Sequence, residues 1–279
     1  MPAKVSSYMT SPVIAASPYD NLAHIRNLMI RHHVGRVVIV EDSKPIGIIT
    51  KSDFIRALFS RRRYTKPLEE IKAEEVMTKE LIVIEENKSI KNAAKLMIRY
   101  GISGLPVVTR DGGLVGIITL TDLTRAYAER YRGRLRVFDA MRKDPPIVSR
   151  SHSLFYIADL LSKDPAGKVI VVEGNKPVGI ITKSDVAFLN TLLLSHNIKY
   201  IKRTSIEKGR ATAVRIYAIP IAADIMTPNP LTTKPLEDLA LAADTMIKNN
   251  ISGLPVVDDE GILMGIVTKI EIARALSKL

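Results

Sequence analysis

One short motif occurs four times along this chain of 279 residues. Each copy reads Gly, two apolar residues, Thr, two variable residues and an acid, and the copies begin at Gly47, Gly116, Gly179 and Gly265. A methionine precedes each glycine by 38 or 39 residues, at Met9, Met77, Met141 and Met226. Repetition at a fixed spacing predicts four copies of one supersecondary unit, stacked so that each covers the apolar face of another.

The four copies fall into two kinds. The first and third share Lys-Pro, an apolar residue and Gly-Ile-Ile-Thr-Lys-Ser-Asp, at residues 44–53 and 176–185. The second and fourth share Ile-Ser-Gly-Leu-Pro-Val-Val, at residues 102–108 and 251–257. The chain is therefore interpreted as a duplicated pair of unlike units, and we expect the unlike units to pair around a pseudo-twofold axis.

The first copy shows the order of elements within a unit. After the short apolar run Val13-Ile14, Ser17 and Pro18 predict a helix start, because Ser is a favoured N-cap and Pro suits the first helical position. Residues 36–41 are β-branched and strand-like, residues 42–45 form a turn, and residues 46–49 form a second strand. A further helix is expected from residue 52 to residue 58. The predicted unit is β-α-β-β-α, and the fold class is α+β.

We expect four units and one insertion along the chain. The units cover residues 1–65, 66–132, 133–195 and 218–279, and the insertion covers residues 196–217. The insertion makes the third connection long: 41 residues separate Asp185 from Met226, against 24 and 19 at the two equivalent places.

These motifs resemble the CBS domain, named after cystathionine β-synthase. The resemblance rests on the Met-Thr openings (residues 9–10, 77–78 and 226–227), the Ile-Ser-Gly-Leu-Pro-Val-Val strand and the four Gly-to-acid motifs, and it covers nearly the whole chain. It implies two Bateman modules that form a flat disc, with clefts between paired units that bind AMP, ADP, ATP or S-adenosylmethionine. It also implies a regulatory role with no obligatory cofactor. The disc forms within one chain or through a homodimer.

The Thr and the acid of each motif are the candidate ribose-binding residues: Thr50 and Asp53, Thr119 and Asp122, Thr182 and Asp185, and Thr268 and Glu271. An ionised carboxylate can accept hydrogen bonds from two ribose hydroxyls, and free amides at a helix start can meet a phosphate. The same Thr-x-x-Asp spacing is also that of a helix capping box, and the two roles are compatible. The longer side chain of Glu271 moves its oxygens outward by roughly 1.5 Å, so we expect the fourth site to bind ribose poorly.

Two basic residues are candidates for phosphate binding. Arg36 and Lys168 stand at the start of the core strand in the first and third units. In related modules a basic side chain at this place reaches the ligand phosphates. The alternative is an exposed charge at a strand end with no partner.

Several classes of protein are excluded or disfavoured. The chain has no Cys, which excludes disulfides, thiolate-bound metals and thiol catalysis. It also lacks the common hydrolase, nucleotide-loop and metalloprotease motifs, and its five His residues have no ligand spacing. We therefore expect no enzyme and no metal site. The longest uncharged apolar stretch, residues 186–198, is too short to cross a bilayer, and no leader sequence is recognised. We expect a cytoplasmic protein, and the absence of Gln with abundant Ile, Lys, Arg and Glu is typical of a thermophile.

The net charge of +12 is unevenly distributed. The three connections, residues 56–66, 125–136 and 196–217, together carry +14, and the remainder of the chain carries −2. Basic residues of this kind suit a phosphate backbone. The candidate RNA-binding residues are Arg61, Arg62, Arg63, Lys66, Arg130, Arg132, Arg134, Arg136, Lys199, Lys202, Arg203, Lys208, Arg210 and Arg215. The insertion is interpreted as a basic hairpin or mobile arm, and the alternative is that all three connections are solvated linkers.

Two functions from different classes stay open. In the first, an adenine-nucleotide-responsive protein binds RNA through its basic connections, as a ribosome-associated dormancy or hibernation factor would. In the second, the chain regulates an enzyme, transporter or transcription factor, and its basic connections meet an acidic protein partner. DNA is a weaker candidate because no groove-reading motif is recognised.

Overall fold

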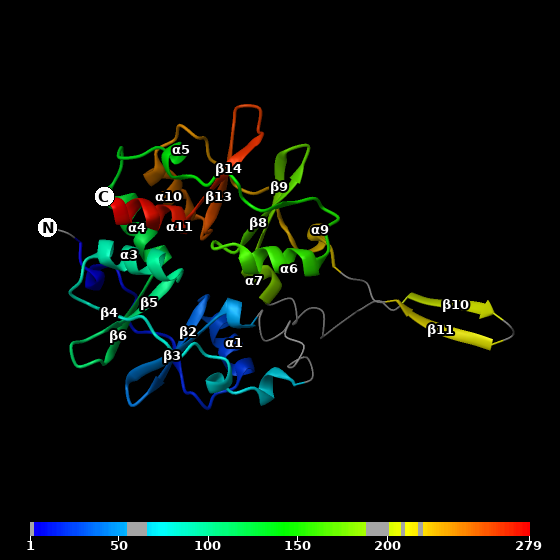
Figure 1. Ribbon diagram of the computed structural model, residues 1–279, viewed down its shortest axis with the longest axis horizontal. Coiled ribbons are helices and arrows are strands. Elements are labelled where there is room, and N and C mark those ends of the chain that lie inside the picture. Colours follow the sequence, from blue (N-terminus) through cyan, green and yellow to red (C-terminus); the bar gives the residue numbers. More distant parts are fainter. Residues whose placement is uncertain (1–2, 55–65, 188–200, 208–209, 217–219) are drawn as a thin grey trace.

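The computed structural model describes residues 3–54, 66–187, 201–207, 210–216 and 220–279 (Figure 1). Within these ranges the predicted β-α-β-β-α order is confirmed. The first repeat contains β1 (Ala15–Ala16), α1 (Leu22–Arg31), β2 (Arg36–Glu41), β3 (Lys44–Thr50) and helical residues 51–54. The second contains β4 (Ile84–Glu85), α3 (Ile90–Tyr100), β5 (Gly104–Val108), β6 (Leu114–Thr119) and α4 (Leu120–Arg130).

The second half of the chain repeats this order. The third repeat contains β7 (Ile147–Val148), α6 (Leu154–Lys163), β8 (Lys168–Glu173), β9 (Lys176–Thr182) and α7 (Lys183–Ala187). The fourth contains β12 (Thr227–Pro228), α10 (Leu239–Lys248), β13 (Gly253–Val257), β14 (Leu263–Thr268) and α11 (Lys269–Lys278). Short helical turns precede the repeats: η1 (Val5–Ser7), η2 (Leu68–Glu70), η3 (Ala73–Glu75), α5 (Val137–Ala140) and α9 (Ala222–Ile225).

The predicted start of the first helix was wrong by four residues. Ser17 to Asp20 form a turn in which the Ser17 amide donates to Asp20 Oδ2, and α1 begins only after Asn21, whose side chain accepts from the His24 amide. Asx side chains satisfy free helix amides as well as Ser does, and here the Ser-Pro pair closes a turn ahead of the helix.

Each repeat is completed by the opening segment of its neighbour within the same half of the chain. The Thr10 backbone pairs with Ile117 of the second repeat, and the Thr78 backbone pairs in return with Ile48 of the first. In the second half, Arg142 pairs with Ile266 and Thr227 with Ile180. This exchange confirms that unlike repeats pair into modules.

The exchange also explains the spacing of Met and Gly. A β-carbon at Gly47 would collide with the sulfur of Met77, and one at Gly116 would collide with the sulfur of Met9. Each of these methionines therefore packs on the motif glycine of the partner repeat, although in the sequence it precedes the motif glycine of its own repeat.

The two modules meet through like repeats. One hydrophobic core contains α3 and α4 of the second repeat with α10 and α11 of the fourth, and includes Met97, Leu123, Met246 and Leu276. The other core joins the first and third repeats. Seen down the shortest axis of the molecule, the four repeats surround a common centre (Figure 1), so the disc forms within one chain.

The long third connection contains a two-stranded antiparallel hairpin. Its strands are β10 (Ile201–Glu207) and β11 (Arg210–Ile216), and they lie apart from the four repeats (Figure 1). The paired strands cover residues 201–207 and 210–216 of the predicted insertion, and its other residues lie outside the described ones. Among the described residues, no helix is long and apolar enough to cross a membrane.

Candidate functional site

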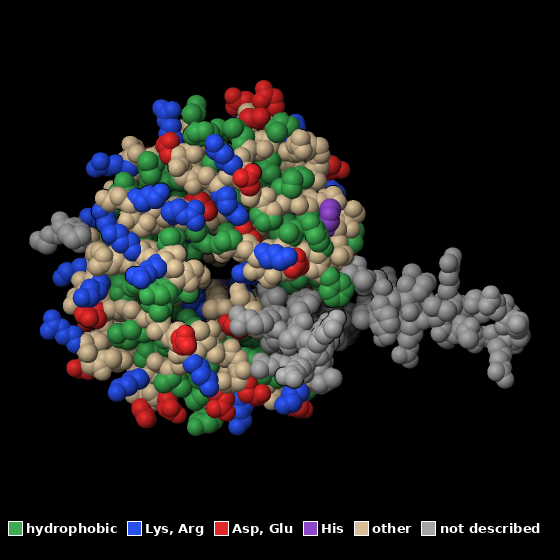
Figure 2. Space-filling model, viewed as in Figure 1, with side chains coloured by type: hydrophobic (Ala, Val, Ile, Leu, Met, Phe, Trp, Pro, Cys, Tyr) green, Lys and Arg blue, Asp and Glu red, His purple; other side chains and the backbone are tan. Residues whose placement is uncertain are grey.

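A cavity of about 740 Å³ opens where the four repeats meet. Figure 2 shows the hollow at the centre of the disc face. Its lining includes residues from every repeat, and six of them are basic: Arg36, Lys51, Lys168, Lys183, Lys269 and Arg274. Two lining residues are acidic, Asp53 and Glu80. The cavity is therefore strongly cationic.

One part of the cavity, which we call its arm, is lined by the first module. Its lining there includes Thr50 at the end of β3, Asp53 in the helical residues that follow, and Thr78 and residues 80–82 of the second repeat. The apolar residues of this part are Ile48, Leu81, Ile82, Met97, Ile102 and Pro106. One cavity thus holds apolar side chains, a carboxylate and basic side chains, which are the groups that can contact the base, the ribose and the phosphates of a nucleotide.

All four predicted ribose motifs form helix capping boxes. In the first, the Thr50 amide and hydroxyl each donate to Asp53 Oδ2 at 2.7 Å. The Thr119–Asp122 and Thr182–Asp185 motifs have the same two bonds, and Thr268 donates likewise to Glu271 Oε2. The capping alternative is confirmed. In the second and fourth motifs the other carboxylate oxygen lies 3.7 Å from Arg125 Nη1 and 3.6 Å from Arg274 Nη1. An ionised carboxylate can accept several hydrogen bonds, so capping and ribose binding are chemically compatible.

The cavity does not reach the four motifs equally. Of the Thr and the acid in each motif, both line the cavity in the first, Thr50 and Asp53, but only the threonine does so in the third and fourth, Thr182 and Thr268. From the second motif it touches the two variable residues, Leu120 and Thr121. The pKa of Asp122 is raised by burial, against which its bonds from Thr119 act.

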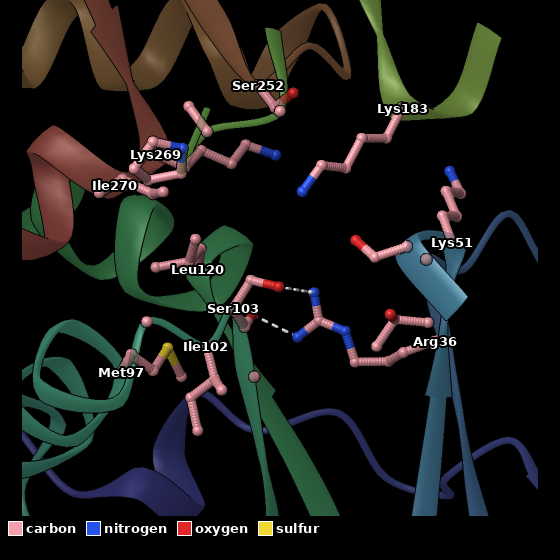
Figure 3. A pocket seen from close by; sticks show the side chains of 18 of the residues that line it. Arg36, Lys51, Met97, Ile102, Ser103, Leu120, Lys183, Ser252, Lys269 and Ile270 are labelled. Atoms are coloured by element: carbon pink, nitrogen blue, oxygen red, sulfur yellow. Dashed lines mark hydrogen bonds between the residues drawn. The ribbon is translucent and has the colours of Figure 1, made fainter. Parts of the chain in front are cut away.

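Arg36 and Lys168 cross from one repeat to its partner within each module. Arg36 donates to the carbonyl and the hydroxyl of Ser103, the latter at 3.0 Å (Figure 3), and Lys168 Nζ donates to Ser252 Oγ at 2.5 Å. Both side chains pass over a glycine, since a β-carbon at Gly104 or Gly253 would collide with them. The alternative of exposed charges without partners is therefore wrong for both residues.

Two lysines cross between the modules. Lys51 Nζ of the first repeat donates to Ser184 Oγ of the third at 2.8 Å, and Lys269 Nζ of the fourth donates to Thr121 Oγ1 of the second at 3.0 Å. Figure 3 shows Arg36, Lys51, Lys183 and Lys269 around one open space. An anion in this space would contact both modules at once.

These lysines were not predicted from the sequence. They occupy the first variable position of the motif in three copies, at Lys51, Lys183 and Lys269, while the second copy has Leu120. A cation in the first turn of a helix opposes the helix dipole. The recurrence of a lysine at this unfavourable position in three copies is the sequence feature that could have indicated a binding role.

A family comparison identifies the chain. The model of the CBS domain matches residues 5–60, 73–129, 137–189 and 222–278, which is most of the sequence. This chain belongs to the CBS domain family.

Relatives of this CBS-domain protein occur in archaea. Protein MK0525 of Methanopyrus kandleri is 38% identical over 40% of this chain, and the match spans 56% of that protein. Protein MJ1225 of Methanocaldococcus jannaschii is 24% identical, with 85% of each chain covered. The crystal structure of MJ1225, described as a candidate archaeal homolog of g-AMPK, has a TM-score of 0.81 at 22% identity and covers 98% of this chain and 99% of that one. A conserved protein from Pyrococcus horikoshii gives a TM-score of 0.66 at 20% identity, with 98% and 99% covered.

The predicted RNA-binding residues of this CBS-domain protein lie in separate places. Lys202, Arg203, Arg210 and Arg215 belong to the hairpin. By contrast, Arg130 ends α4, and Arg132, Arg134 and Arg136 follow it before α5, at the opposite end of the view in Figure 1. Lys66 is exposed before η2. Arg61, Arg62, Arg63, Lys199 and Lys208 lie outside the described residues.

Burial weakens the bases of the central cavity. Burial, with the nearby Lys269 ammonium, lowers the pKa of Lys168 to about 8, and burial lowers the pKa of Lys269 to about 8. It also lowers the pKa of Lys51 and that of Arg36, the latter to about 10. Both lysines near 8 are therefore charged at pH 7 and lose their charge at mildly alkaline pH.

We expect anion binding to weaken as the pH rises through 8, because Lys168 and Lys269 deprotonate there. Titration calorimetry of ADP at pH 7 and pH 9 checks this, and at pH 8 binding should take up protons, measured in buffers of different ionisation enthalpy. Affinity that is unchanged between pH 7 and 9 would count against phosphate contact with these lysines.

The same two pKa values affect the stability of the ligand-free protein. In the unfolded chain both lysines have an ordinary pKa of about 10.4. Between pH 8 and about 10 the unfolded chain therefore binds more protons than the folded protein, so these two groups make the free energy of unfolding increase with pH in this range.

Proposed function

We propose that this protein binds an adenine nucleotide at the first module and acts as a non-catalytic nucleotide sensor. The observation that carries the proposal is that one cavity is lined by apolar residues, by the Asp53 carboxylate and by six basic residues, which form its basic chamber. In this arrangement adenine lies against Leu81, Ile82 and Pro106, and the Asp53 carboxylate accepts from the ribose. The phosphates extend toward Lys51 and Lys183.

The charge of the cavity favours some adenosine ligands over others. Six basic residues against two acidic ones suit the phosphates of AMP, ADP or ATP, and should favour the more highly charged di- and triphosphates. S-adenosylmethionine carries a sulfonium cation, which the same residues would repel. Competition with a fluorescent ADP analogue ranks the affinities of these ligands. We expect ATP and ADP to displace the analogue at lower concentrations than S-adenosylmethionine. Equal competition by S-adenosylmethionine would contradict this assignment.

A second part of the proposal concerns the hairpin. We propose that residues 196–217 form an arm that meets RNA, with the ribosome as the expected partner. The strand register places Lys202 directly opposite Arg215, and like charges in one cross-strand pair are unfavourable unless an anion lies near. An isolated two-stranded hairpin is also only marginally stable, so a partner surface would stabilise it. The alternative, an enzyme, transporter or transcription factor regulated through an acidic surface, uses the same arm.

Replacing Lys202, Arg203, Arg210 and Arg215 with Ser should weaken RNA binding and flatten its salt dependence. Each lost phosphate contact reduces the slope of log affinity against log salt by roughly 0.7 to 0.9. The matched control replaces Arg130, Arg132, Arg134 and Arg136 with Ser, which removes the same charge at the other end of the molecule.

Sedimentation with ribosomal subunits, with and without RNase, is the measurement. A smaller loss in the control set supports the hairpin as the main arm. If the hairpin variant sediments as the wild type does, the RNA assignment fails, and capture that survives RNase would favour the acidic protein partner.

A further inference from the structure

The four backbone pairings between opening segment and partner strand are equivalent, but one differs in sequence. Three of them use a threonine, Thr10, Thr78 and Thr227, and all three are exposed. The fourth uses Arg142, which is half-buried and pairs with Ile266 through both of its backbone groups at 2.9 Å. We call these places junctions and number them by the motif on the partner strand, so the cavity opens at the first junction (Thr78) and Arg142 stands at the fourth.

Arg142 forms an ion pair with Asp164. Arg142 Nη1 lies 2.5 Å from Asp164 Oδ1, and the carboxylate is fully buried. Asp164 is the C-cap of α6, where a negative charge opposes the helix dipole. The C-caps of the equivalent helices α1, α3 and α10 are His32, Gly101 and Asn249, none of them acidic. An arginine in place of threonine and a buried aspartate at a helix end are each unfavourable alone. Together they compensate each other.

The fourth junction is filled at this point. Arg142 Nη2 is shielded from solvent and has no hydrogen-bond partner among the described residues, although 26% of the side chain is exposed. The backbone is also closer there: a β-carbon at Gly265 would collide with the Arg142 carbonyl oxygen, whereas the equivalent glycines Gly47 and Gly179 adjoin flexible methionine side chains. Thr78 of the first junction, by contrast, lines the central cavity.

We infer that the Arg142–Asp164 ion pair closes the fourth junction to nucleosides, so that the basic residues beside it, Lys168 and Lys269, serve ligands held by other junctions. This inference rests on the proposed nucleotide binding. Glu271 adds a third departure at the same junction, since the other motifs end in Asp. The closed junction makes the two modules unequal, because in the second module the Arg142–Asp164 ion pair occupies the place of a ligand.

The test opens one junction and closes another. The opening variant combines Arg142→Thr, Asp164→Asn and Glu271→Asp, which restores the pattern of the other junctions. The Asp164→Asn change keeps a side-chain oxygen that can still accept from the Lys168 amide, as the native carboxylate does. The closing variant is Thr78→Arg. The matched control, Arg150→Thr with Glu173→Asn, removes an exposed ion pair of 3.2 Å from the same module.

Equilibrium dialysis with radiolabelled ADP counts the bound equivalents, and circular dichroism and thermal melting verify the fold. We expect the opening variant to gain one equivalent of ADP over the wild type, the closing variant to lose one, and the control to match the wild type. A folded opening variant that binds the wild-type number of ADP equivalents would overturn the closure. The loss of one ADP equivalent in Glu271→Gln would also overturn it, because a ligand would then be bound at the fourth junction of the wild type.

The closing variant keeps the test decisive if the opening variant does not fold. An unchanged count in Thr78→Arg contradicts the premise that an arginine at a junction excludes the ligand. Wild-type protein that binds no ADP would remove both the proposed function and this inference.

Discussion

Replacement of Asp53 by Asn is expected to weaken ADP binding by about 10- to 100-fold. The carboxylate lines the arm of the cavity and caps the following helix through Oδ2, and it is the proposed ribose acceptor. A hydrogen bond to a charged group contributes about 1.5–3 kcal/mol, and each 1.4 kcal/mol corresponds to about a tenfold change in affinity. Titration calorimetry of ADP measures the loss.

The control for this variant is Asp139→Asn. Asp139 caps α5 through the Arg136 amide at 2.9 Å, with the same spacing of cap and acid, and it does not line the cavity. Both variants should lose a similar small amount of stability, at most about 0.5–2 kcal/mol as for the loss of a helix cap. Only Asp53→Asn should lose affinity. Wild-type affinity in Asp53→Asn would leave this residue with a capping role alone.

Neutralising Lys51, Lys183 and Lys269 together, each to Gln, should have the larger effect. All three line the basic chamber, and the proposed phosphates meet them there. We expect ATP affinity to fall by about 100-fold or more, because several charged hydrogen bonds are lost at once. Adenosine, which has no phosphate, should bind with unchanged affinity.

The matched control removes three lysines from the surface. Lys88, Lys95 and Lys163 are exposed and lie outside the cavity, and their replacement by Gln changes the net charge equally. This control separates a local loss of phosphate contacts from a general loss of electrostatic attraction. Equal losses of ATP affinity in the two triple variants would show that the chamber does not hold the phosphates.

The repeat explains why the fold could be predicted. Four motifs at equal spacing define one unit, and the shared runs of alternate copies identify which units are unlike. The pairing of opening segments with partner repeats could not be read in the same way, because Met9 stands nearest in sequence to the glycine of its own unit and packs on Gly116 of another. Contacts between units depend on the path of the chain in space, which a local spacing does not contain.

The site was predictable in part for a similar reason. Thr50 and Asp53 belong to a repeated motif, and their capping bonds follow from spacing within one helix turn. Lys51 was overlooked because its hydrogen-bond partner, Ser184, is far away in the sequence and belongs to the other module. The ion pair of Arg142 and Asp164 likewise joins two residues whose roles are visible only when the repeats are superposed in space.

The central claim is that an adenine nucleotide occupies the arm of the cavity at the first module, with its phosphates in the chamber shared by all four repeats. A crystal structure of the protein grown with saturating ADP tests it most directly. The account predicts ribose hydroxyls on Asp53, adenine between residues 81–82 and Pro106, and phosphates beside Lys51 and Lys183. Nucleotide density at another place, or an empty cavity at saturating ADP, would contradict it.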